Sequence, residues 1–191
     1  MKQEIVKNIR RLCILAGAGL LMVAGGMLLS LRNAGDQLDE YASSLLMLIP
    51  EPQGAVLEER LDNTMPVLSL EGTDFIGILE MPRYDSVLPT CAQWGKIYRY
   101  PSCLAGSVYD GSIQIGGTTQ TGQFDFFREI LVGDSVFFTD VAGNRYAYTV
   151  ADLRYEKHAD QTTLQRKNAD LTLFIKNVYA FEYLIVFCEA L

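Results

Sequence analysis

The chain has 191 residues, of which 49% are hydrophobic and 20% charged, a composition that suits one globular domain with a small appendage. It carries 16 lysines and arginines against 23 aspartates and glutamates, and the first 11 residues hold four of the bases but only one of the acids. The remaining chain therefore has 12 bases and 22 acids, and this acidity argues against binding nucleic acid or anionic lipid headgroups.

The N-terminal region predicts a membrane anchor. Residues 12–31 contain no charge over about 20 positions, enough for a helix of roughly 30 Å, the thickness of the bilayer hydrocarbon. Bases precede this run, and Arg32 and then acids follow it. The positive-inside rule predicts that residues 1–11 form a cytoplasmic tail and that the C-terminal domain lies outside the cell membrane. We expect a single-pass signal anchor. A cleaved signal peptide is the alternative, although its apolar region is usually only about 7–15 residues long.

Residues 32–71 are expected to form a helical stalk and linker. Apolar residues at helical spacing predict a helix over 35–49, and Pro50 and Pro52 end it. The poorly patterned residues 56–70 indicate a partial helix followed by a linker. The stalk either packs on the following domain or holds that domain away from the membrane.

Residues 72–191 are predicted to form a mainly β domain, because short runs rich in branched and aromatic residues alternate with turn residues. The predicted strands are 73–82, 132–140, 144–150, 170–176 and 183–188. Other expected elements are a short helix over 123–130, a hairpin turn at 141–143, and a polar connection over 151–169 with one helical turn near 163–167. The aromatic residues of the intervening loop, Trp94, Tyr98 and Tyr100, are expected to pack over one end of a barrel rather than to bind a ligand.

The four cysteines do not have the spacing of a metal site. There is no C-x-x-C, and His158 is the only histidine. Outside the cytoplasm disulfides are permitted, and Cys91–Cys103 is the only pair close in sequence, so its disulfide state stays open, as does that of Cys188. We predict neither a metal nor a cofactor.

Five segments of the β domain resemble sortases, and in particular class B sortases. Residues 75–82 are similar to the family's "Y-I-G-x-L-x-I-P" opening, and 88–90 to the Leu-Pro-Val-like segment that follows it. Residues 106–118 resemble the Gly-Ser stretch that leads into a strand ending in Gly-His-Asn. Residues 133–150 match "G-D-x-V-x-F-T-D-x-x-G-N-x-Y-x-Y-x-V", and 170–176 resemble an Asp-Leu-Thr-Leu-Phe-Thr-Cys run. The resemblance implies a closed eight-stranded β-barrel with short helices.

The resemblance also implies a chemistry that this chain lacks. In sortases a Cys thiolate attacks the Thr–Gly bond of a Leu-Pro-x-Thr-Gly-like sorting signal, a His transfers protons, and an Arg stabilises the oxyanion. The positions that match the His, Cys and Arg hold Gly117, Lys176 and Tyr183. Together with Thr118 and Ile175, these residues are the expected lining of a peptide groove.

Each replacement lacks the chemical property that its position requires. A lysine at its reference pKa is only about 0.04% neutral at pH 7, and its acyl product would be a stable amide. Glycine cannot transfer a proton, and tyrosine lacks the forked cation that suits a developing negative charge. The sequence therefore predicts a pseudosortase, a sortase barrel without the sortase reaction.

We accordingly expect a membrane-anchored protein of a Gram-positive cell surface that binds sorting-signal-like peptides or a partner in surface-protein or pilus assembly, such as a pilin or an active sortase. One alternative is an active cysteine transpeptidase that uses displaced residues such as Cys188 or Cys91 with His158. For His158, a solvated loop residue is the simpler interpretation. Another alternative is a purely structural membrane-surface protein.

Overall fold

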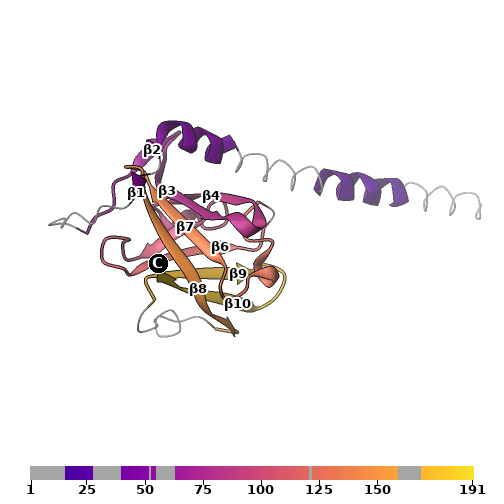
Figure 1. Ribbon diagram of the computed structural model, residues 1–191. Coiled ribbons are helices and arrows are strands. Elements are labelled where there is room, and N and C mark those ends of the chain that lie inside the picture. The colour runs from indigo at the N-terminus through magenta and orange to yellow at the C-terminus, as the bar shows by residue number, and fades with distance from the viewer. Residues whose placement is uncertain (1–15, 28–39, 52, 55–62, 121, 159–168) are drawn as a thin grey trace, which may run out of the picture.

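The computed structural model describes residues 16–27, 40–51, 53–54, 63–120, 122–158 and 169–191 (Figure 1). Over these residues the chain is mainly β, and eight strands close into a barrel in the ring order β8–β10–β9–β6–β5–β4–β3–β7 and back to β8. The barrel strands are β3 (Thr73–Met81), β4 (Ser86–Cys91), β5 (Ser102–Ala105), β6 (Ile113–Thr118), β7 (Ser135–Asp140), β8 (Asn144–Glu156), β9 (Leu171–Asn177) and β10 (Glu182–Ala190). The predicted eight-stranded barrel is therefore confirmed.

Short elements complete the described fold. Strand β1 (Gln53–Gly54) pairs in parallel with β8, and β2 (Leu68–Leu70) pairs antiparallel with β3. Three single 3₁₀ turns lie in the connections between barrel strands, namely η1 (Pro82–Tyr84), η2 (Trp94–Lys96) and η3 (Phe127–Glu129). Of these turns, η2 carries Trp94 of the candidate site, whereas η1 and η3 lie beside Asp134.

The barrel strands alternate between an interior face and an outer face, since successive Cβ atoms of a strand point to opposite sides. In β9, Leu173 and Ile175 are fully buried in the interior cluster, whereas Phe174 packs on the outer face with Ile185 and Phe187 of β10. Burying one large aliphatic side chain stabilises the fold by about 1.5–3 kcal/mol. The interior cluster is therefore the main source of stability, and a second, smaller buried cluster packs on the outer face of β9 and β10.

The predicted hairpin is present as β7–β8, and Asp140 at the end of β7 holds its turn together. This fully buried carboxylate accepts hydrogen bonds from the backbone N–H groups of Ala142 and Asn144 and from the Asn144 side chain, each at 2.9 Å, and from the Tyr109 hydroxyl at 3.0 Å. Gly143 has φ of 86°, in the left-handed region that favours glycine. The Asp, Gly and Asn of the motif over 133–150 are therefore the residues that form this turn.

Strand β8 is longer than the sequence pattern predicts. It continues through Glu156, whereas residues 151–169 were expected to form a polar connection. The extension is held by pairing with β10, in which Tyr183 lies opposite Glu156, and the register shifts once between Phe187 and Cys188. Pairing with β10 therefore keeps these polar residues in a strand, although their sequence predicts a connection. The helical turn expected near 163–167 lies outside the described residues.

Three shorter segments also differ from expectation. The predicted linker ends in β2, and β5 was not expected. The helix predicted over 123–130 is replaced by turns and the single 3₁₀ turn η3. Phe124 and Phe127 are both buried in the interior cluster, so this segment follows the barrel wall instead of a helical path.

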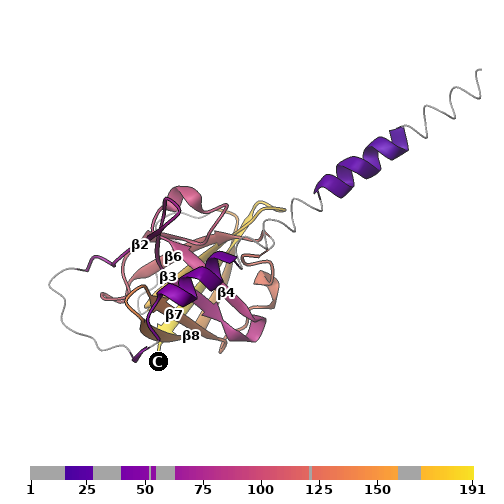
Figure 2. The ribbon, with the colours of Figure 1, turned by 90° about the horizontal axis from the view of Figure 1, so that it is seen from above.

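Residues 40–48 form a helix that lies across β3 and β4 on the outside of the barrel (Figure 2). Leu45 is fully buried in a cluster that contains Phe75 and Tyr100. The ring of Tyr41 meets Tyr100 edge-on, with centroids 5.5 Å apart. This part of the predicted stalk therefore packs on the barrel.

Part of the predicted membrane anchor is also described. Residues 16–27 are helical and extend away from the barrel in Figure 1. Residues 12–15 and 28–31 of the predicted anchor lie outside the described residues. Within the described part of the chain, no helix combines the length and the apolar character needed to cross a membrane.

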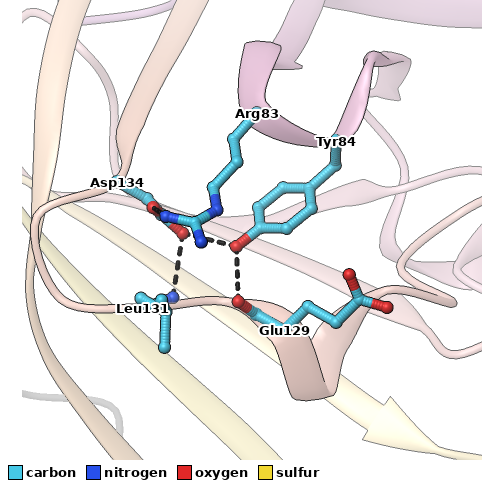
Figure 3. Close-up of polar contacts among 5 residues, drawn as sticks. All are labelled: Arg83, Tyr84, Glu129, Leu131 and Asp134. Atoms are coloured by element: carbon cyan, nitrogen blue, oxygen red, sulfur yellow. Dashed lines mark hydrogen bonds and ion pairs between the residues drawn. The ribbon is translucent and has the colours of Figure 1, made fainter.

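A polar cluster around Asp134 fixes the connection that leads into β7 (Figure 3). Asp134 is buried, accepts hydrogen bonds from the Leu131 N–H at 2.8 Å and from the Tyr84 hydroxyl, and pairs with Arg83 at 3.0 Å. The Tyr84 hydroxyl also lies 2.6 Å from the carbonyl oxygen of Glu129. Burial raises the pKa of the Asp134 carboxyl, but the hydrogen bonds from Tyr84 and Leu131 and the charge of Arg83 outweigh burial, so the pKa is lowered overall.

Asp134→Asn is expected to lower the free energy of unfolding by about 1–3 kcal/mol at pH 7, because hydrogen bonds to a charged group are lost. The folded-state pKa lies below the unfolded value near ~3.9, so the carboxylate's contribution is present above that pH and disappears as pH falls through the folded-state pKa. Urea denaturation of both proteins between pH 7 and pH 2 should show the difference shrinking toward acid. Asp125→Asn, an exposed carboxylate of the neighbouring segment, is the control and should change stability by less than about 0.5 kcal/mol. A difference that stays constant with pH would contradict this assignment.

Candidate functional site

Lys176 and Tyr183 lie directly opposite each other on the antiparallel pair β9–β10, so both side chains point to the outer face. The ring of Tyr183 stacks on Phe174, with centroids 4.9 Å apart and an interplanar angle of 15°. Trp94 packs on the other side of Phe174, with centroids 6.3 Å apart. An aromatic surface therefore adjoins the Lys176 ammonium.

The turn η2 and the residues after it bring Tyr98 to Lys176. The Lys176 Nζ atom donates a hydrogen bond to the Tyr98 hydroxyl at 2.8 Å and lies 5.3 Å from the centroid of that ring. The hydrogen bond with Tyr98 is the main cause of a raised Lys176 pKa, which keeps the side chain an ammonium ion at neutral pH. We refer to Trp94, Tyr98, Phe174, Lys176 and Tyr183 together as the Lys176 face.

Gly116 allows the loop to approach this closely. A Cβ atom at Gly116 would lie 2.3 Å from Cζ3 of Trp94 and 3.2 Å from Cδ1 of Ile97. The indole therefore lies directly on the backbone of β6, beside Phe174, which is the cross-strand partner of Gly116. Glycine is required at this position because any side chain would displace Trp94.

Gly117 points to the barrel interior, away from Lys176. Its cross-strand partner is Ile175, and a Cβ atom at position 117 would lie 2.3 Å from Cε2 of Phe124. Phe124 is fully buried, and the neighbouring Gln123 accepts a hydrogen bond from the Thr118 N–H at 3.0 Å. The space beside Gly117 is thus filled by an aromatic ring.

The residues predicted to line the site therefore divide between the two faces of the barrel wall. Lys176 and Tyr183 are partly exposed on the outer face, and Thr118 lies opposite Lys176 but is fully buried. Gly117 and Ile175 face inward, since each lies one residue from its outward-facing neighbour in its strand. The sequence interpretation assigned Trp94 and Tyr98 to packing alone. The contact of Tyr98 with Lys176 spans 78 positions, and no sequence pattern indicated it.

The three cysteines in the described part of the chain are free thiols, and none lies in the Lys176 face. Cys188 is fully buried in the interior, where desolvation raises its pKa to about 12. Burial also raises the pKa values of Cys91, under the helix formed by 40–48, and of the half-buried Cys103. Thiolates are the reactive form, so these environments make all three thiols poor nucleophiles.

His158 is exposed just beyond the end of β8. Cys188 pairs with Val150, and Glu156 lies six residues farther along β8, roughly 20 Å in an extended strand, with His158 beyond it. Among the described residues, no group of three or more His, Cys, Asp or Glu side chains could hold a metal ion.

Comparison with known proteins identifies the class of fold. No family model matches the chain, and no curated protein matches its sequence. Among solved structures, sortase C1 from Streptococcus agalactiae has a TM-score of 0.55 at 21% identity, with 84% of this chain and 86% of that chain covered. Sortase A from Corynebacterium diphtheriae has a TM-score of 0.54 at 16% identity, with 84% of each chain covered. Sortase C1 from Streptococcus suis has a TM-score of 0.50 at 16% identity, with 61% and 73% covered. The described barrel is therefore a sortase-type barrel.

Gly117→Ala is expected to lower the free energy of unfolding by about 1–3 kcal/mol, because the added methyl group overlaps the fully buried ring of Phe124. Chemical denaturation measures this change. Gly95→Ala is the matched control, since a Cβ atom there meets no atom within 4 Å, and its effect should stay below about 0.5 kcal/mol. Equal effects of the two substitutions would show that position 117 is not closed to side chains.

Tyr98→Phe is expected to lower the pKa of Lys176 toward its ordinary value, because the hydrogen bond that favours the charged amine is removed while the ring remains. NMR titration of the Lys176 side-chain ¹³Cε and ¹⁵Nζ signals measures the shift. Tyr179→Phe, an exposed tyrosine of the β9–β10 turn, should leave the Lys176 titration unchanged. An identical Lys176 pKa in wild type and Tyr98→Phe would refute the role assigned to this hydrogen bond.

Proposed function

We propose that this chain is a sortase-fold protein that binds a sorting-signal-like peptide on its Lys176 face without cleaving it. The observation that carries the proposal is the environment of Lys176. An ammonium held by Tyr98, beside exposed aromatic surface, occupies the position that matches the sortase nucleophile.

The chemistry of the three matching positions supports binding rather than transpeptidation. Lys176 has a raised pKa, so its neutral, nucleophilic fraction at pH 7 is even smaller than the ~0.04% of an ordinary lysine. The interior at Gly117 is filled by Phe124, which leaves no space there for an acid–base side chain. The ring of Tyr183 stacks on Phe174, and tyrosine lacks the guanidinium with which arginine stabilises an oxyanion.

Displaced residues supply no replacement for this chemistry. Cys188 lies on the opposite face of β10 from Tyr183, in the barrel interior, and its thiol pKa of about 12 leaves almost no thiolate at neutral pH. Cys91 is fully buried beneath the helix formed by 40–48. A transpeptidase built from either thiol with His158 would need a rearrangement of the barrel wall.

What the face retains is suited to recognition of an extended peptide. Tyr98 is 54% exposed, and Trp94 and Tyr183 are partly exposed, so aromatic surface is available to apolar side chains. Aromatic residues of this kind contribute a large share of the binding energy in protein interfaces. The face therefore offers apolar contact area around one fixed positive charge.

Attachment to the cell membrane through residues 12–31 is part of the same proposal, with the barrel outside the cell. The described part of this segment, 16–27, is a helix whose Leu20, Leu21 and Met22 side chains are each more than 70% exposed. Exposed apolar side chains on a helix suit a lipid environment. Such attachment would bring the Lys176 face near surface proteins or their sorting machinery, the partners that we propose.

The full chain in detergent micelles is expected to bind a fluorescent Leu-Pro-Ala-Thr-Gly-Gly peptide and to form no ligated product with a triglycine amine acceptor. Fluorescence anisotropy measures binding, and mass spectrometry measures ligation. Tyr183→Ala should weaken binding about tenfold, because stacking surface worth about 1.4 kcal/mol is lost, whereas Tyr155→Ala, an exposed tyrosine on β8, should not. Absence of binding, or turnover that iodoacetamide abolishes, would refute the proposal.

A further inference from the structure

The Lys176 ammonium has no acidic partner among the described residues. Among the described residues, its hydrogen bond and its cation–π contact are both made with Tyr98. Four arginines of the barrel, in contrast, each lie within ion-pair distance of a carboxylate. These pairs are Arg83–Asp134, Arg128–Glu182, Arg145–Glu80 and Arg154–Asp152. Lys176 is therefore a cation on an aromatic face that no carboxylate of the described residues neutralises, in a chain with seven more acids than bases.

Tyr98 orients this ammonium without saturating it. A lysine ammonium has three N–H donors, and one of them is directed at the Tyr98 hydroxyl. Lys176 is partly exposed, so the other two donors are open to solvent or to a ligand. The stacked Tyr183 and Phe174 rings lie on the same face and reduce the water around an incoming group. A singly charged acceptor fits the two remaining donors.

The surroundings favour a carboxylate over a phosphate. Phosphate sites usually combine arginine forks with several free backbone N–H groups. Here three described N–H groups close to Lys176 in the chain or across the strand pair are already used. The N–H of Thr119 donates to the Lys176 carbonyl at 3.0 Å, that of Val178 to the Thr119 hydroxyl at 3.1 Å, and that of Tyr179 to Asn177 at 3.0 Å. One ammonium matches the single charge of a carboxylate.

We infer that Lys176 binds the carboxylate of a peptide ligand, such as the carboxylate at the new end of a cleaved sorting signal. This inference rests on the proposed function and makes its ligand specific. An ammonium stabilises a charged carboxylate beside it more than a neutral amide, so the face distinguishes a peptide that ends in a free carboxylate from one that does not.

Three dansylated peptides test the inference on the full chain in detergent micelles: Leu-Pro-Ala-Thr as the free acid, the same peptide as its carboxamide, and Leu-Pro-Ala-Asp carboxamide. The free acid is expected to bind about tenfold more tightly than the Leu-Pro-Ala-Thr carboxamide. This advantage should decrease in 0.5 M salt, which screens a partly exposed charge pair. The aspartate peptide reports whether a side-chain carboxylate serves as well as a terminal one.

Lys176→Met retains the apolar stem without the charge and should bind the acid and the carboxamide with equal affinity. Lys96→Met is the matched control, because Lys96 lies on η2 but donates to Thr73 at 2.8 Å, and it should preserve the acid's advantage. Equal binding of acid and carboxamide to wild type would overturn the inference while peptide binding stands. Failure of all three peptides to bind would instead overturn the proposed function, and the inference with it.

Discussion

The position of β9 between β6 and β10 is the constraint on which the rest of the site depends. β9 pairs in parallel with β6 and antiparallel with β10, and these two registers decide which side chains share a face. Lys176 is thereby aligned with Thr118 on one side and Tyr183 on the other. A shift of one residue in either register would exchange the interior and outer residues of a strand. The interior residues Leu173 and Ile175 make such a shift costly, because it would expose them to water.

Aromatic rings pack directly on two glycines of β6, one ring on each face of the barrel wall. Trp94 lies on Gly116 from outside, and Phe124 lies against Gly117 from inside, so two consecutive glycines of β6 are covered by rings on opposite faces. The loop that carries Trp94 also carries Tyr98, which holds the Lys176 ammonium. The loop that contains Trp94 and Tyr98 therefore both packs on the barrel and contributes to the candidate site. This arrangement explains how a segment expected to serve only packing also contributes a polar contact.

Much of the fold could be predicted from the sequence, because local chemistry specifies it. The β7–β8 hairpin follows from Asp140 and Gly143, and the apolar run of β9 and β10 identifies the central strands. The extension of β8 through Glu156 could not be predicted, since pairing with β10 stabilises it and the residues themselves are polar. At the site, the sequence indicated Lys176 and Tyr183. The inward direction of Gly117 and the contact with Tyr98 depend on strand register and on a contact across 78 positions, and neither has a sequence signal.

The burial of the thiols has a consequence for the chemical durability of the protein. Oxidants attack exposed thiolates first, and Cys91 and Cys188 are neither exposed nor ionised at neutral pH. The Lys176 face itself contains no sulfur atom. Because the Lys176 face consists of an amine, hydroxyls and aromatic rings, we expect it to stay intact at peroxide concentrations that would inactivate a thiolate-dependent enzyme.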